Sequence, residues 1–271
     1  MNFPIRYVEK AAMDQQAVNI RSDHKVIYLN HMGDDKEIVE DARTSLRSNM
    51  VGRSMDRNLS AKDTERISDF IRFRHASTLR GSVLKLGIET TIAMQRQLRT
   101  HWVGNKQAWA DWEWEENDIF GFNDQSGKFA RYKPTFYVPS FEMSRIEVDG
   151  FNPMKPEYRQ CTPEEYEILK QLMVMEYTNV WNTYQALNNR LYSRELTRMI
   201  IPEGMYVAGR MTLNLNAAFG LMSLRIDHPE NITTTKPQAE IQQIAEGIEE
   251  IVKKLWPAAH QAWNENGRTR P

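Results

Sequence analysis

One segment of regular apolar periodicity, from Pro163 to Leu191, places the strongest constraint on the fold. Its apolar and aromatic residues recur every three or four positions, which is the spacing of one face of an α-helix. These residues are Tyr166, Leu169, Met173, Tyr177, Val180, Tyr184 and Leu187. The helix start is marked by Thr162 as N-cap, Pro163 at the first helical position and Glu165 three residues after the cap. The pattern predicts one long helix whose stripe faces the core or another subunit.

The remaining segments mix helices and strands without a regular alternation. Periodicity predicts helices over 34–46, 61–73 and 238–255, the last of them ending before Trp256-Pro257. Strands are predicted over 82–92, where apolar and polar residues nearly alternate, over "TFYVPS" (135–140) and over "MYVAGRMTLNL" (205–215). Short helices are predicted over 193–202 and "NAAFGLMSLR" (216–225), and a loop over 117–133, which is rich in Gly, Asn and Asp. This mixture predicts the α+β class, in a single domain over 1–271.

Charge and composition exclude several classes of protein. The formal net charge is −1 and the pI is about 6.6, so no general attraction to nucleic acid is expected and no nucleic-acid partner is predicted. No apolar run approaches the roughly 20 residues that a membrane-spanning helix needs. The first residues, "MNFPIRYVEKAAMD", lack the apolar core of a signal peptide. We therefore expect a cytoplasmic protein without a membrane partner.

The sequence carries no recognisable motif for a protein nucleophile or a metal site. The single cysteine, Cys161, excludes an internal disulfide, and it precedes a predicted helix with no histidine nearby in sequence, a setting in which a thiol is usually inert. The six histidines show neither HxxxH nor HExxH spacing, so no metal site is predicted. The glycine-rich dinucleotide motif, the P-loop and the GxSxG motif are also missing. An enzyme of this kind is expected to rely on an organic cofactor.

Three arginines are candidates for anion binding. Arg194 and Arg198 stand four residues apart on one predicted helical face, where like charges repel, so they require a shared anion or acidic partners such as Glu195 or Glu240. Arg225 ends a predicted apolar helix, where the helix dipole favours a cation and a bound ligand could also use the guanidinium. Structural pairing and ligand binding both remain open at each position.

A basic and aromatic stretch, "QRQLRTHWVGNKQAWADWEW" (95–114), follows the predicted strand over 82–92. It combines arginine, lysine and histidine with four tryptophans. Such a stretch could stack on the bases of single-stranded nucleic acid, although the near-zero net charge argues against this. The tryptophans could also pack against a neighbouring subunit, or stack on a base, a pterin or a flavin ring.

Several segments, in collinear order, resemble the flavin-dependent thymidylate synthase family. "VIYLNHMGDDKEIVEDARTSL" (26–46) is similar to the family's N-terminal segment, with its Gly-Asp/Asp pair and a helix ending in Ala-Arg-x-Ser. "RHASTLRGSVLKLGIETTIAMQRQLRTH" (74–101) is similar to its His-x-Thr-Pro-Phe-x-His start, strand and Arg-Gln-containing helix. "RYKPTFYVPS" (131–140) resembles the Tyr-x-Pro strand that follows. Two later segments resemble the family's C-terminal half: "SRELTRMIIPEGMYVAGRMTLNLNAAFGLMSLR" (193–225) and "QAEIQQIAEGI" (238–248).

The resemblance implies a mixed sheet packed with long helices, and a homotetramer that binds FAD at subunit interfaces. It also implies that NADPH reduces the FAD, and that methylenetetrahydrofolate supplies the carbon of a methyl group on C5 of a deoxypyrimidine monophosphate, dUMP by default. Carried over by position, the flavin contacts are Ser45, His75, Ser77, His101 and Asn214. The nucleotide contacts are Gln97, Arg99, Arg198 and Arg225, and the catalytic residues are His101 and Arg225. No cysteine attacks the pyrimidine in this family, in agreement with the setting of Cys161.

The chain departs from the family at the nucleotide-binding signature. Arg-His-Arg falls on Thr-His-Trp (100–102), so only His101 is retained, and Glu-x-Ser-x-Arg falls on Ala-Trp-Ala-Asp-Trp (108–112). Arg80 stands in place of a flavin-contacting glutamate, and Asn216 in place of an arginine. Loss of one arginine–phosphate contact lowers affinity about ten- to a hundredfold.

These departures leave alternative functions open. The same chemistry could act on dCMP, or could yield a hydroxymethyl product. A further alternative is a flavin-binding or nucleotide-binding homologue without synthase activity.

Overall fold

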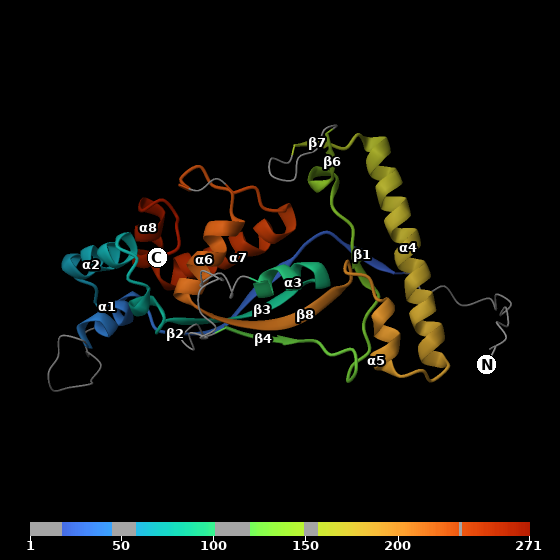
Figure 1. Ribbon diagram of the computed structural model, residues 1–271, viewed down its shortest axis with the longest axis horizontal. Coiled ribbons are helices and arrows are strands. Elements are labelled where there is room, and N and C mark those ends of the chain that lie inside the picture. The colour runs from blue at the N-terminus through green and yellow to red at the C-terminus, as the bar shows by residue number, and fades with distance from the viewer. Residues whose placement is uncertain (1–17, 45–57, 101–119, 149–156, 233–234) are drawn as a thin grey trace, which may run out of the picture. The chain divides into compact units, whose positions relative to one another are not determined.

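A computed structural model of the chain describes residues 18–44, 58–100, 120–148, 157–232 and 235–271 (Figure 1). The chain divides into two compact units. The sheet unit comprises Asp23–Gln125 and Val207–Pro271, and the long-helix unit comprises Met1–Ser22 and Ser126–Tyr206. The single domain expected over 1–271 stays a prediction.

A four-stranded sheet with the strand order β2-β3-β8-β4 forms the centre of the sheet unit. Its strands are β2 (Lys25–Met32), β3 (Val83–Thr91), β8 (Tyr206–Asn214) and β4 (Phe120–Asp124). β2 pairs antiparallel with β3, and β4 pairs antiparallel with β8. The alternation predicted over 82–92 is confirmed, because Leu84, Leu86 and Ile88 are buried while Lys85 between them is exposed.

β4 lies inside 117–133, where composition predicts a loop, so that prediction is wrong for 120–124. Gly121, Asn123 and Asp124 are poor strand formers, and local propensity therefore gives no strand signal. Pairing with β8 overrides this preference. Phe122 lies opposite Met211 in the register of the two strands, and its side chain packs against the hydrophobic core.

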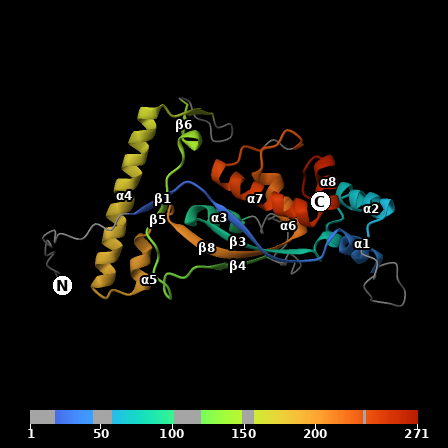
Figure 2. The same ribbon diagram turned by 180° about the vertical axis from the view of Figure 1, so that it is seen from behind.

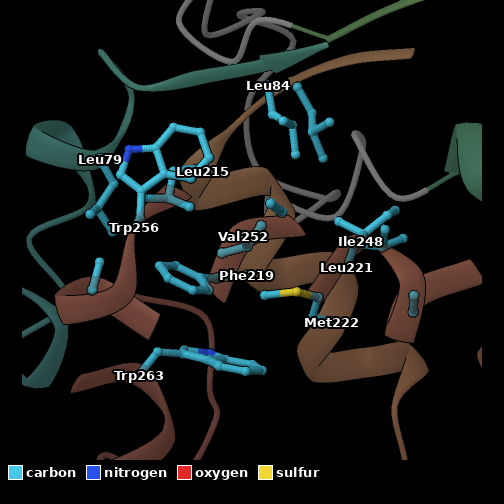
Figure 3. Close-up of a cluster of buried hydrophobic side chains, with 14 of the residues drawn as sticks. Leu79, Leu84, Leu215, Phe219, Leu221, Met222, Ile248, Val252, Trp256 and Trp263 are labelled. Atoms are coloured by element: carbon cyan, nitrogen blue, oxygen red, sulfur yellow. The ribbon is translucent and has the colours of Figure 1, made fainter. Parts of the chain in front are cut away.

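Helices cover one side of this sheet. The helices of the sheet unit are α1 (Asp35–Thr44), α2 (Ala61–Arg72), the 3-10 helix η1 (Ala76–Leu79), α3 (Ile92–Thr100), α6 (Leu215–Arg225), α7 (Ala239–Leu255) and α8 (Pro257–Glu265). Figure 1 and Figure 2 both show α3, α6 and α7 on the same side of the sheet. Apolar side chains fill the space among the helices of this unit. Phe219 of α6 stacks on Trp263 of α8, with ring centroids 5.2 Å apart (Figure 3).

α8 follows α7 directly, although Trp256-Pro257 predicts the end of the last helix. Pro257 occupies the first helical position, where an N–H group would have no partner within the helix. Asp35 of α1 supplies the cap: its Oδ2 accepts a hydrogen bond from Ala258 N (2.8 Å) and its Oδ1 accepts one from Ala259 N (3.0 Å). A cap that lies 223 residues upstream leaves no local signal in the sequence.

The long-helix unit is built around α4 (Pro163–Asn189), the long helix that the periodicity predicts. The Thr162 hydroxyl accepts from the Glu165 N–H (3.3 Å) and the Glu165 carboxylate accepts from the Thr162 N–H (2.8 Å), so the predicted cap is confirmed. The other elements are β1 (Asn19–Arg21) paired parallel with β5 (Thr135–Tyr137), β6 (Arg145–Glu147) paired antiparallel with β7 (Tyr158–Gln160), and the short helices η3 (Phe141–Met143), α5 (Arg194–Thr197) and η4 (Arg198–Ile200).

The two faces of α4 differ in their surroundings. Tyr177, Trp181 and Tyr184 are buried, and Phe136 of β5 stacks on Tyr177 at a centroid distance of 4.7 Å. Three large apolar residues of the same helix are exposed: Ile168, Leu172 and Met175. Neither α4 nor any other helix of the described residues is long and apolar enough to cross a membrane.

Candidate functional site

Three of the predicted flavin contacts lie on two elements of the sheet unit that contact each other, η1 and α6. His75 and Ser77 lie at the start of η1, which packs against α6. Asn214 is the N-cap of α6. The backbone links the two segments, because Leu215 N–H donates to the Ser82 carbonyl oxygen (2.9 Å). Residues that are far apart in sequence therefore share one end of the sheet.

Two of these three side chains are open to a flavin. His75 and Ser77 are exposed, and neither side chain makes a hydrogen bond within the described part of the chain. The His75 ring packs edge-on against Phe70 with centroids 6.5 Å apart. Asn214 is buried, and its side-chain oxygen accepts from Ala217 N–H (2.8 Å), which fixes the amide. An exposed imidazole and an exposed hydroxyl can contact a flavin ring or its phosphates, so His75 and Ser77 fit the cofactor, whereas the Asn214 amide is fully buried and caps its own helix.

The predicted nucleotide contacts are distributed over both units. Gln97 and Arg99 lie on α3, and Arg225 ends α6, all within the sheet unit. Arg198 begins η4 and belongs to the long-helix unit. Two further predicted site residues fall outside the described residues: Ser45 and His101.

Both α3 residues contact neighbours within the sheet unit. The Gln97 side-chain amide donates to Gln238 Oε1 at 2.9 Å, which ties α3 to the start of α7. Arg99 forms an ion pair with Asp124 of β4, and its guanidinium carbon lies 4.9 Å from the centroid of the Phe122 ring. The Arg99–Asp124 pair has no counterpart in the sequence prediction, because only the unexpected strand β4 brings the carboxylate there.

Arg225 combines a positive charge with partial burial. It lies at the C-terminal end of α6, where the helix dipole favours a cation. Burial lowers the pKa of its guanidinium, although an arginine remains protonated at neutral pH. Partial removal from water strengthens its attraction for an anion. These properties suit a residue that stabilises negative charge on a bound ligand.

The two arginines predicted on one helical face have different neighbours. α5 ends at Thr197, so Arg198 already belongs to η4. Arg194 Nη1 donates to the Lys128 carbonyl oxygen (3.3 Å). Lys128 Nζ lies 2.9 Å from Glu195 Oε1. The hydrogen bond from Lys128, and to a lesser extent the charge of Arg198, lower the pKa of the Glu195 carboxyl. Glu195 therefore pairs mainly with the lysine.

Asn216, which stands in place of a family arginine, has a partner that the sequence does not indicate. It is fully buried in the first turn of α6. With its amide oriented to satisfy both contacts, its nitrogen donates to the Pro271 oxygen (3.2 Å) and its oxygen accepts from Arg270 Nη2 (2.9 Å). A guanidinium is thus present beside position 216, but it comes from the segment after α8.

Comparison with known proteins identifies relatives along nearly the whole chain. The model of the family described as thymidylate synthase complementing protein matches residues 28–258. A flavin-dependent thymidylate synthase of Streptomyces coelicolor is 28% identical over 262 residues, which covers 95% of this chain and 98% of the relative. The flavin-dependent thymidylate synthase of Tropheryma whipplei is 27% identical over 250 residues, covering 92% and 96% of the two chains.

A solved structure shares the fold. The crystal structure of a UMP/dUMP methylase, PolB, from Streptomyces cacaoi bound with 5-Br UMP matches with a TM-score of 0.79 at 23% identity, and covers 94% of this chain and 100% of that chain. This likeness confirms the predicted α+β fold. The family match confirms the predicted class of enzyme, a methyltransferase of the thymidylate synthase type. The chain belongs to the thymidylate synthase complementing protein family, the flavin-dependent thymidylate synthases.

Proposed function

We propose that this chain transfers a one-carbon unit from methylenetetrahydrofolate to C5 of a deoxypyrimidine monophosphate, with FAD as cofactor and NADPH as reductant. The default reaction converts dUMP to dTMP. The family match over 28–258 carries the proposal. Two further observations support it: the relatives are named for flavin dependence and thymidylate synthesis, and the structural neighbour has been solved with 5-Br UMP and with 5-Br dUMP.

The cofactor is assigned to the residues around the start of α6. His75 and Ser77 offer exposed polar groups there, and the fully buried Asn214 amide fixes the start of α6 through its capping bond. Ser45 and His101 complete the predicted set. FAD, when bound, supplies the redox chemistry that converts the transferred carbon into a methyl group. The side chains of this chain orient the flavin and keep it beside the nucleotide.

The nucleotide is assigned to Gln97, Arg99, Arg198 and Arg225. Negative charge develops on the pyrimidine carbonyl as C5 becomes nucleophilic, and the partly buried Arg225 guanidinium stabilises that charge. Gln97 is preorganised by its hydrogen bond to Gln238. A guanidinium carries five N–H donors, so Arg99 can bind a phosphate oxygen and still retain Asp124.

A homotetramer with sites at subunit interfaces is part of the proposal. The exposed positions of Ile168, Leu172 and Met175 on α4 support it, because large apolar residues at helical spacing on a surface mark a contact with another chain. Leu172→Glu should lower the molar mass measured by light scattering after gel filtration, whereas Lys170→Glu, an exposed neighbour, should leave it unchanged. An identical mass for both variants would remove α4 from the proposed interface.

Tritium release from C5-labelled nucleotides tests the reaction. Purified protein should be yellow with bound FAD, and should release tritium from labelled dUMP when methylenetetrahydrofolate and NADPH are present. Release from labelled dCMP in place of dUMP would assign the other nucleotide, and chromatography of the product separates methyl from hydroxymethyl. Bound FAD without release from either nucleotide would reject synthase activity and leave a flavin-binding homologue.

A further inference from the structure

The end of α2 holds an arginine in a backbone conformation that favours glycine. Arg74 has a φ of 58°. Its N–H donates to the Ile71 carbonyl (3.2 Å), and the His75 N–H donates to the Phe70 carbonyl (2.7 Å). This is the Schellman pattern of helix termination, whose left-handed residue is usually glycine. A side chain at that position lowers stability relative to glycine, so an arginine there suggests a use for its guanidinium.

The two residues before Arg74 are also exposed. Arg72 holds its guanidinium carbon 5.4 Å from the centroid of the Phe73 ring, and 61% of Phe73 is exposed. Arg72 and Arg74 are both exposed, and within the described residues neither guanidinium makes a hydrogen bond or an ion pair. Asp69, one turn before Arg72, does not pair with it. The 72–74 cluster (Arg72, Phe73 and Arg74) therefore combines two uncompensated cations with one aromatic ring.

This combination matches the chemistry of a phosphorylated nucleotide. An exposed aromatic ring can stack on a base. A guanidinium group can donate two parallel, charge-assisted hydrogen bonds to the oxygens of one phosphate. An adenosine that carries a 2′-phosphate offers a base and a doubly charged anion close together. Arginine is the residue that accommodates the 2′-phosphate in other dinucleotide sites.

The position of the cluster favours the reductant over the pyrimidine nucleotide. Arg74 is bonded directly to His75, the first of the proposed flavin contacts, and the reductant has to reach the flavin. The proposed pyrimidine-nucleotide residues lie on other elements, at Gln97, Arg99, Arg198 and Arg225. A ligand held at 72–74 therefore lies next to the flavin contacts without using the substrate residues.

We propose that the 72–74 cluster binds the adenosine 2′-phosphate of NADPH and so selects NADPH over NADH. The proposal rests on the proposed function, because it takes the flavin contacts at His75 and Ser77 as given. Any cation at the end of α2 would satisfy the helix dipole, so the dipole alone does not account for arginine at this position.

Calorimetric titration of the FAD-loaded protein with NADP⁺ and with NAD⁺ tests the assignment. The oxidised dinucleotides bind without turnover, so affinity is measured apart from activity. Arg72→Gln/Arg74→Gln should weaken NADP⁺ binding by roughly tenfold or more, the size expected for loss of charged hydrogen bonds. NAD⁺ binding should change by less than about threefold. Phe73→Ala should weaken both dinucleotides, because both carry adenine.

Two control variants separate binding from folding. Lys62→Gln removes an exposed cation from the first turn of the same helix, about 15 Å from Arg72 along the axis, and should leave NADP⁺ binding unchanged. Arg74→Gly removes the guanidinium while supplying the residue that the backbone favours. It should raise the temperature of unfolding and still weaken NADP⁺ binding.

The outcomes distinguish this proposal from the proposed function. NADP⁺ affinity of Arg72→Gln/Arg74→Gln within about twofold of the parent protein would overturn the assignment. A parallel loss of FAD affinity would also overturn it, and would assign the cluster to the cofactor's own diphosphate. If the parent protein takes up no FAD, the proposed function fails. NADP⁺ titration of the FAD-free protein then tests the cluster by itself, and no binding there rejects it.

Discussion

Replacing Glu249 by glutamine should destabilise the sheet unit, because Glu249 is the counter-ion of a buried arginine. Arg268 Nη1 and Nη2 lie 2.8 and 2.9 Å from the two Glu249 carboxylate oxygens, and Arg268 Nε donates to Asn231 Oδ1 at 3.0 Å. His260 Nε2 lies 2.8 Å from Glu249 Oε1. The Arg268 side chain is 2% exposed and that of Glu249 is 15% exposed. Loss of the carboxylate would leave the guanidinium charge buried without compensation.

The size of the effect follows from the pKa of Glu249. Burial raises this pKa, but hydrogen bonds from His260 and Arg268 and the charge of Arg268 outweigh burial and lower it from 4.5 to about 2. Lowering the pKa from 4.5 to about 2, at about 1.4 kcal/mol for each pKa unit, corresponds to about 3.5 kcal/mol of stability. The folded-state pKa is the lower one, so this contribution is complete above pH 4.5 and is lost as the pH falls toward 2.

Urea unfolding at several pH values, at fixed protein and FAD concentrations, measures the effect. Glu249→Gln should lower the free energy of unfolding by about 3.5 kcal/mol at pH 7, and the difference from the parent protein should shrink below pH 4.5. Glu250→Gln is the matched control, because it removes the same charge from the next, exposed position. Equal stabilities of the two variants at pH 7, or a difference that does not change with pH, would refute the reasoning.

Three further predictions concern other parts of the molecule. Asp63→Asn should lower the free energy of unfolding by about 2 kcal/mol or more, because Asp63 Oδ2 accepts from the buried Lys36 ammonium at 2.9 Å. Burial raises the pKa of Asp63, but hydrogen bonds from Lys36 and Ser60 and the charge of Arg43 lower it to about 2, so the loss in urea unfolding should fade below pH 3.8. Gly204→Ala should lower the unfolding temperature, because a Cβ there would lie 2.2 Å from the buried Tyr177 hydroxyl; an unchanged temperature would contradict this packing. Arg225→Ala should abolish tritium release from dUMP with little effect on FAD affinity, and undiminished release would reject its role in turnover.

Local patterns suffice for elements whose determinants are close in sequence. The start of α4 is set by Thr162 and Glu165, three residues apart, and each satisfies a backbone N–H that the other residue contributes. The burial of Leu84 and Leu86 in β3 follows from a two-residue period. Both features could be predicted because a few neighbouring residues decide them.

Partners chosen by the fold could not be predicted. Asp124 reaches Arg99 only because β4 pairs with β8, and the composition around Asp124 predicts a loop. Arg270 reaches Asn216 from a segment that carries no motif. The spacing of His75 and Asn214 in the sequence says nothing about the contact between η1 and α6, so for the candidate site the sequence offers only its family resemblance.

The Asp35 cap of α8 has a consequence for the order in which the sheet unit folds. The unit is discontinuous, because Ser126–Tyr206 is inserted between its two segments. α1 lacks a partner for Asp35 until α8, 223 residues downstream, has left the ribosome. Contacts of such high sequence separation slow folding. The long-helix unit can therefore complete its own internal contacts during synthesis. The sheet unit can form the Asp35 cap only after residues 257–265 have been translated.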